Sequence, residues 1–151
     1  MTDVHTPEQR SRNMAAIRSK GTVPELKVRK ALHAHGLRYR LNRMDLPGRP
    51  DIVMAKHSAA VFVHGCFWHM HKCPYGKPVP ATNADFWSQK RVGNVARDRR
   101  NARALRAAGW RVYTIWECQT RNQELLDRRI ARLVNDLEKS LRNPIVTAFQ
   151  K

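Results

Sequence analysis

Apolar residues recur every three or four positions over residues 123–141, which is the period of an amphipathic helix. A C-terminal helix is therefore predicted there. A second helix is predicted over residues 22–36, because Thr-Val-Pro-Glu at its start has the capping-box spacing and Gly36 is typical of a helix end. A long helix is predicted over residues 83–108, with Gly109 ending it.

Four shorter segments have the character of β-strands. Residues 37–41 and 110–116 alternate apolar and polar side chains, whereas residues 52–55 and 59–63 are almost entirely apolar. The first three strands should form a meander, with a turn-forming break at residues 46–50. The third strand, the long helix and the last strand form a crossover unit, so these two strands should be parallel. We predict an α/β fold with a mixed central sheet flanked by helices.

The N-terminal segment has helix signals of its own at residues 7–18, where Thr6, Pro7 and Gln9 provide an N-cap, a first-turn proline and a capping-box partner. This short helix carries Arg10, Arg12, Met14 and Arg18. One interpretation is a basic arm over residues 1–20 that lies on DNA; the other is a solvated, frayed terminus.

Composition narrows the choice of partner. The remaining residues, 21–151, suit a single domain with one core. Lysine and arginine total 29 against 12 acids, a net charge of +17, which indicates a polyanionic partner and favours nucleic acid. No apolar run approaches the length that spans a bilayer and no secretory h-region is present, so we expect a soluble, intracellular protein.

Metal-ligating residue types are concentrated in the segment that follows the third strand. Three histidines and two cysteines lie between His64 and Cys73. The chain has three cysteines, an odd number that excludes a closed disulfide framework in a monomer. Cys66, His71 and Cys73, joined by Cys118 at the end of the last strand, could form a tetrahedral zinc site. The alternative is three unrelated buried thiols.

Two acids stand at informative positions. Asp51 begins an apolar strand and should lie near Val63 and His64 if strands two and three pair antiparallel, which suggests a hard-metal site with a proton-transfer group. An aspartate that caps a turn after proline is the alternative. Glu25 is either a helix-capping glutamate or a carboxylate pointed toward that metal.

Two adjacent aromatic residues, Phe67 and Trp68, lie in the cysteine-containing loop, where a core position for both is awkward. Packing beneath the loop is the alternative to exposure. Trp87, at the start of the long helix, could reach the same place. The same helix carries candidate phosphate contacts, for which a solvated helix face is the alternative, at Arg97, Arg99, Arg100 and Arg103.

Several motifs together resemble one family, the very-short-patch repair endonucleases. They are Pro-Gly-Arg-Pro-Asp at 47–51, Val-His-Gly-Cys-Phe-Trp-His-Met-His-Lys-Cys at 63–73, Pro-Ala-Thr at 80–82, Phe86-Trp87, Asn94, Arg-Asp-Arg-Arg at 97–100, Gly-Trp-Arg-Val at 109–112 and Trp-Glu-Cys at 116–118. The resemblance implies a restriction-endonuclease-like fold and an enzyme that nicks double-stranded DNA beside the thymine of a T:G mismatch, a product of 5-methylcytosine deamination.

The resemblance also assigns site residues. It implies a catalytic Mg²⁺ held by Asp51 and the Val63 backbone carbonyl, with Glu25 joining through water and with His64 and His69 in catalysis. From these positions we expect His69 to be the general base and His64 to orient or stabilise the phosphate. The chain differs from the wider nuclease superfamily, because Phe62-Val63-His64 stands where most members carry an acid, a spacer and a lysine.

The implied structural zinc corresponds to Cys66, His71, Cys73 and Cys118. For DNA, the resemblance implies that aromatic side chains enter the base stack from one groove and Met14 approaches from the other, while lysine and asparagine side chains meet base edges. The residues concerned are Met14, Phe67, Trp68, Trp87, Lys90 and Asn94.

Such an enzyme would be a monomer in the bacterial cytoplasm, associated with the nucleoid, with mismatch-repair proteins as further candidate partners and no membrane association. Two other functions share parts of the pattern. Another sequence-specific nuclease of the same fold would share Asp51 and the basic charge. A zinc-stabilised DNA-binding module without catalysis would share everything except turnover.

Overall fold

A four-stranded mixed sheet lies at the centre of the protein, with the strand order β1-β2-β3-β4. The computed structural model describes residues 21–78 and 81–142; the predicted N-terminal helix and Met14 lie outside them. The strands β1 and β2 and the strands β2 and β3 pair antiparallel, whereas β3 and β4 are parallel, as the crossover predicts. Their bounds are β1 Arg40–Leu41, β2 Ile52–Met54, β3 Ala59–His64 and β4 Arg111–Trp116.

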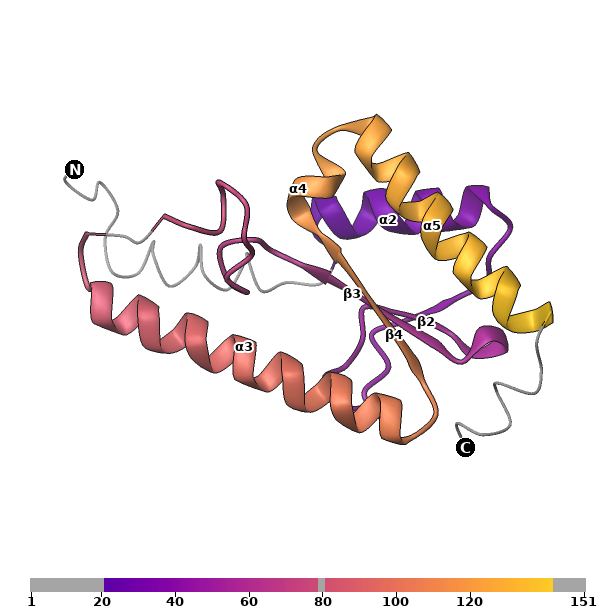
Figure 1. Cartoon of the computed structure of the whole chain (residues 1–151), viewed down its shortest axis with the longest axis horizontal. Helices are drawn as coiled ribbons and strands as arrows, with labels where there is room; N and C mark the ends of the chain where they lie inside the picture. The colour runs from indigo at the N-terminus through magenta and orange to yellow at the C-terminus, as the bar shows by residue number, and fades with distance from the viewer. Residues whose placement is uncertain (1–20, 79–80, 143–151) are drawn as a thin grey trace.

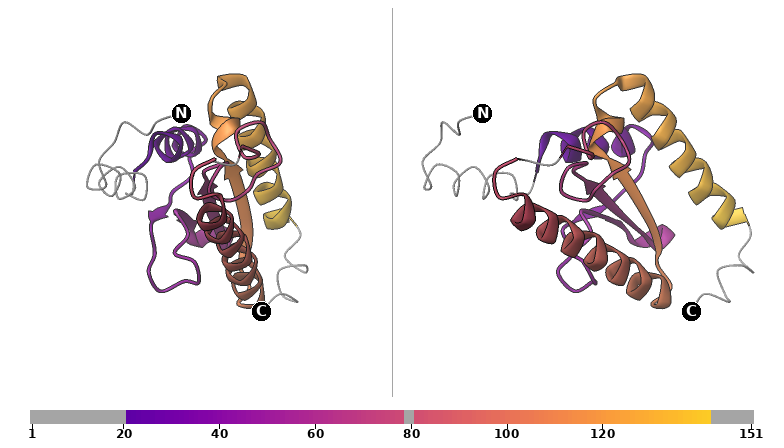
Figure 2. Two further views of the ribbon diagram at one scale, coloured as in Figure 1. Left: turned by 90° about the vertical axis from the view of Figure 1, so that its left-hand side faces the viewer. Right: turned by 60° about the vertical axis from the view of Figure 1, so that its left-hand side comes forward.

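Helices cover both faces of this sheet (Figures 1 and 2). Three of the predicted helices are present, as α2 Val23–Ala34, α3 Ala84–Ala107 and α5 Gln123–Arg142. The helices α2 and α5 lie on one face, and α3 lies on the other. None of the helices in the described part of the chain is long and apolar enough to cross a membrane.

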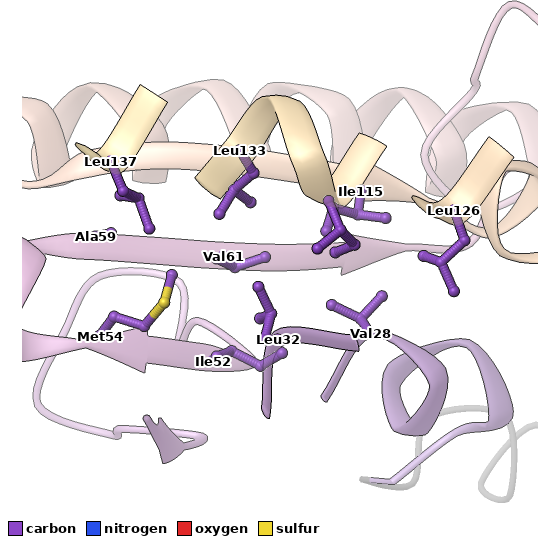
Figure 3. Packing of buried hydrophobic residues seen from close by; sticks show 11 residues of the cluster. Val28, Leu32, Ile52, Met54, Ala59, Val61, Ile115, Leu126, Leu133 and Leu137 are labelled. Atoms are coloured by element: carbon purple, nitrogen blue, oxygen red, sulfur yellow. The ribbon is translucent and has the colours of Figure 1, made fainter. Parts of the chain in front are cut away.

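The hydrophobic core fills the layer between the sheet and the two helices α2 and α5. Because successive strand residues point to opposite faces, every second residue of β3 contributes to it. Figure 3 shows the leucines of α5 pointing toward apolar side chains of β3 and α2. The fully buried members include Val28, Leu32, Ile52, Met54, Ala59, Val61, Ile115, Leu133 and Leu137. The apolar positions that predicted the last helix are thus the ones that pack.

Three local predictions need correction. The first strand has only two residues, Arg40–Leu41, instead of residues 37–41. Both are exposed at the sheet edge, whereas Leu37 and Tyr39 pack against the core without pairing to β2. Ala55 is not in a strand but begins a 3₁₀ turn, Ala55–His57. Cys118 is not at the end of the last strand but in a short helix, α4 Glu117–Thr120, which begins where Gln119 accepts a hydrogen bond from the Trp116 N–H.

The long helix α3 packs on the sheet with only part of its length. Among its residues, Arg91 and Leu105 are the buried ones. Its N-terminal half extends past the sheet alongside the segment that follows β3 (Figure 1). A helix this exposed is typical of one that faces a partner or another segment of the chain, rather than a core.

Candidate functional site

Asp51 lies beside the end of β3, as the antiparallel pairing of β2 and β3 requires. With Ile52 opposite Val61 in the register, Asp51 comes level with Phe62, next to Val63. The Val63 N–H donates to Asp51 Oδ2 at 2.7 Å. The pKa of Asp51 is raised to about 6, chiefly by burial; the Val63 hydrogen bond opposes this rise and the neighbouring Glu25 charge adds to it. A cation beside this carboxylate would stabilise its ionised form.

His64, His69 and Asp98 form a second cluster at the end of the same strand. The rings of His64 and His69 stack with their centroids 3.8 Å apart and their planes 3° from parallel. Asp98 Oδ2 lies 2.5 Å from His69 Nδ1, and its Oδ1 lies 3.9 Å from His64 Nε2. Burial lowers the pKa of His64 to about 4, so this imidazole is neutral at pH 7.

Asp98 was given no role by the sequence analysis, although it lies in the motif Arg-Asp-Arg-Arg. It reaches the histidines from α3, 29 residues after His69 in the chain. An acid inside a run of arginines was the available signal, because such an acid opposes the prevailing charge of the helix.

Both acids and both histidines surround one cavity of about 580 Å³ between the sheet and α3. Phe62 and His64 of β3 point into it because they alternate with the core-facing Val61. The polar lining is formed by Arg49, Asp51, His64, His69, Arg97, Asp98, Asn101 and Thr114. Acidic, basic and imidazole groups therefore meet at one concave place, an arrangement suited to acid–base chemistry on an anionic substrate.

Glu25 is buried but does not line this cavity. Its Oε1 lies 2.5 Å from Arg29 Nη2, and its Oε2 accepts from the Gly21 N–H at 3.1 Å. The Thr22 hydroxyl accepts from the Glu25 N–H at 3.4 Å. Glu25 thus caps its helix, and its charge also raises the pKa of Asp51. A role for Glu25 toward a metal stays a prediction.

The four expected soft ligands come together at the other end of the loop. One ligand atom each from Cys66, His71, Cys73 and Cys118 lies within 4.8 Å of all the others. Cys118 Sγ is 3.5 Å from His71 Nδ1, and the Cys118 N–H donates to Cys66 Sγ at 3.3 Å. Three sulfurs and one imidazole nitrogen suit a tetrahedral soft-metal site. Burial raises the pKa of the Cys66 thiol to about 12, and a bound cation would offset this cost to its thiolate.

Tight backbone turns bring these ligands together. The His71 N–H donates to the Cys66 carbonyl at 3.0 Å, and the Gly76 N–H donates to the Cys73 carbonyl at 3.0 Å. A Cβ at position 76 would lie 2.0 Å from the His71 carbonyl oxygen, so only glycine fits there. The cysteine and histidine cluster therefore depends on a close backbone approach that the sequence alone did not reveal.

The aromatic residues gather in a cluster of their own, outside the hydrophobic core. Ring centroids of Trp68 lie 5.2 Å from Phe67 and 5.4 Å from Trp87. All three side chains are half-buried. Lys90 Nζ lies 5.5 Å from the Trp68 ring centroid, and the Asn94 amide nitrogen donates to the Trp68 carbonyl at 3.0 Å. The structure thus joins five of the six predicted DNA contacts in one patch.

Comparison with known proteins places the chain among DNA mismatch endonucleases and related nicking enzymes. A family described as DNA mismatch endonuclease Vsr matches residues 2–75. The chain is 45% identical to the DNA mismatch endonuclease Vsr of Escherichia coli, over 83% of this chain and 80% of that protein. It is 46% identical to the type II nicking enzyme V.XorIIP of Xanthomonas oryzae, over 89% and 98% of the two chains. For the type II nicking enzyme V.NmeAIP of Neisseria meningitidis the identity is 42%, over 93% and 100%.

Replacing Gly76 by alanine should destabilise the protein by about 1–3 kcal/mol, because the new methyl group displaces the His71 carbonyl. Urea unfolding measures the change. Gly93→Ala is the matched control, since a Cβ there meets nothing within 4 Å and alanine favours a helix. Equal stability of the two variants would contradict the close approach.

Asp51→Asn should stabilise the protein at neutral pH and leave its stability nearly unchanged near pH 4. The folded-state pKa of about 6 lies above the ordinary value of 3.8, so wild type loses stability as the pH rises through this window. The difference should reach on the order of 3 kcal/mol. Unfolding is measured from pH 4 to pH 8 without added Mg²⁺ and without chelator.

The control for this series is Asp45→Asn. The hydrogen bond from Arg43 keeps the pKa of Asp45 below its usual range. Removing the Asp45 charge should therefore not stabilise the protein at neutral pH. A constant effect of Asp51→Asn across the whole pH range would show that Asp51 is not held in a costly ionised form.

Proposed function

The chain belongs to the Vsr family of DNA mismatch endonucleases, and we propose on that basis that it nicks one strand of duplex DNA beside the thymine of a T:G mismatch. This nick would begin very-short-patch repair. The observation that carries the proposal is the meeting of Asp51, His64, His69 and Asp98 around one cavity. The proposal includes a restriction-endonuclease-like fold for residues 21–151, with residues 1–20 as a DNA-contacting arm that carries Met14.

The proposed reaction is hydrolysis of one phosphodiester, in which a water oxygen bonds to phosphorus and the bridging oxygen leaves. Asp51 and the Val63 carbonyl would hold Mg²⁺, which supplies positive charge to the phosphate and acidifies bound water. A carboxylate and a carbonyl are hard oxygen ligands, so these residues fit the ion. Glu25, already paired with Arg29, would act on the site through ordered water.

His69 is the proposed general base. Its Nδ1 faces Asp98 at 2.5 Å, so the tautomer with the proton on Nδ1 leaves Nε2 able to accept a proton from the attacking water. The Asp98 carboxylate then stabilises the imidazolium that forms. His64 stays neutral because of its burial and can orient the phosphate by a hydrogen bond.

The proposed structural metal is zinc, held by Cys66, His71, Cys73 and Cys118. Supporting this choice are the ligand types, three thiols and one imidazole, and their mutual distances. Such a site joins the loop after β3 to the start of α4 and needs no open coordination position. It would therefore hold the loop in place rather than take part in hydrolysis.

Mismatch recognition is proposed to rest on the aromatic cluster. Phe67, Trp68 and Trp87 would insert into the base stack, at an unstacking cost of about a few kcal/mol that is lower at a mispair. Lys90 and Asn94 lie beside Trp68 and could meet base edges. The net charge of +17 supplies attraction to the phosphate backbone.

A nicking assay tests the proposal directly. Labelled duplexes that differ only in a T:G or a C:G pair are incubated with wild type, with and without Mg²⁺. We expect one nick, only in the thymine strand, only with the T:G pair and only with Mg²⁺. Asp51→Asn should abolish it, and Asp98→Asn should slow it by at least about 10²-fold. Mismatch binding by the variants, measured by anisotropy, is the control for folding.

Two outcomes would contradict the assignment. If wild type binds the T:G duplex without cutting it, the protein is a DNA-binding module without catalysis. If wild type cuts both duplexes equally, the protein is a nuclease with no preference for the mismatch.

Cys118→Ser should lower both the metal content and the stability of the protein. Wild type should contain about one zinc per chain by elemental analysis, and the variant should lose it and unfold at lower urea concentration. If wild type purified without chelator folds fully but contains no zinc, the three cysteines are buried thiols and not metal ligands.

A further inference from the structure

Three side chains on one face of α3 hold three consecutive residues of the loop after β3. Arg91 Nε donates to the Phe67 carbonyl at 2.7 Å, and Asn94 Nδ2 donates to the Trp68 carbonyl at 3.0 Å. Asp98 pairs with His69. Helix positions three and four apart lie above one another, so the steps from 91 to 94 to 98 follow the helix period while the loop advances one residue each time.

Arg91 is the first of these three α3 residues and makes the most contacts with the loop. Its side chain is buried, with 3% of the residue exposed, and its guanidinium also donates to the carbonyls of Gly76 and Pro78. The guanidinium carbon lies 4.5 Å from the Phe67 ring centroid. Within the described residues, its hydrogen-bond acceptors are thus all loop carbonyls. The planar fork of arginine can serve several carbonyls at once, which a lysine cannot.

The loop residues held in this way belong to two different parts of the proposed function. Phe67 and Trp68 are the proposed wedge, and His69 is the proposed base. They are adjacent in the chain, and the His69 N–H also donates to the Gly65 carbonyl at 3.2 Å, which closes the turn around them. A shift of the wedge along α3 would therefore move His69 relative to Asp98 and the cavity.

We propose that Arg91 and Asn94 are positioning residues. Their hydrogen bonds to the backbone fix the positions of the aromatic wedge and of His69 relative to α3. Seating of the wedge in DNA then sets the position of His69 at the phosphate. This inference rests on the proposed function and adds a mechanism for mismatch specificity. The enzyme would distinguish a T:G from a C:G pair by its rate of cleavage more than by its binding affinity. The reason is that displacing a catalytic group such as His69 by about 1 Å can slow the reaction about 10²-fold.

The test is Arg91→Lys, which keeps the charge and removes the fork. Single-turnover nicking is measured at saturating enzyme on T:G and C:G duplexes, together with mismatch affinity and zinc content. We expect the T:G rate constant to fall by roughly 10- to 100-fold, with affinity within about threefold of wild type. Partial unfolding would lower the amplitude of the reaction and leave the rate constant alone, so this readout separates positioning from stability.

Arg106→Lys is the matched control, because Arg106 is an exposed arginine on the same helix and does not line the cavity. Its rate constant should equal that of wild type. If Arg91→Lys does not fold, Asn94→Ala, at a half-buried position, should show the same loss of rate with mismatch affinity within about threefold of wild type. A loss of rate matched by an equal loss of affinity would mark a DNA contact and overturn the positioning role. An unchanged rate constant in a folded variant would overturn the proposal. Absence of T:G nicking by wild type would instead refute the proposed function.

Discussion

The segment from Gly65 to Pro78 carries three of the four clustered cysteine and histidine residues, two of the clustered aromatic residues and His69, yet it forms no helix or strand. Ordering a backbone residue costs about 1–2 kcal/mol in conformational entropy, and here no sheet ladder offsets that cost. The segment is fixed instead from two sides, by the cysteine and histidine cluster at one side and by α3 at the other. The placement of the aromatic residues and of His69 depends on these attachments.

The sheet positions the other residues of the candidate site, Asp51 and His64, where burial makes their charged forms unfavourable. Its pairing sets Asp51 beside Val63, where burial raises the pKa of the carboxyl, and it turns His64 into the same region, where burial lowers the pKa of the imidazole. Both shifts oppose the charged form of the group, which costs stability in the way that is common at functional sites. The core on the opposite face, between the sheet and the helices α2 and α5, carries the stability of the fold.

Much of this arrangement could be predicted from local pattern. The periodicity of residues 123–141 predicted α5, the apolar segments predicted β2 and β3, and the alternation over residues 110–116 predicted β4, because burial on one or both faces fixes those patterns. The odd cysteine count and the ligand types predicted the grouping of Cys66, His71, Cys73 and Cys118, a possible metal-binding cluster. Asp98 and Arg91 could not be assigned in the same way, because their partners lie 29 and 24 residues away in a loop without regular structure. Both looked like ordinary residues of a charged, exposed helix.

The central claim is that a bound metal holds the loop that carries both recognition and catalysis, and hydrogen–deuterium exchange tests it most directly. Amide exchange is followed by mass spectrometry in the metal-loaded protein and after removal of the metal by a chelator. The account predicts that protection is lost across residues 65–78 while β3 and β4 remain protected. Unchanged protection of residues 65–78 in protein shown to be free of metal would contradict it.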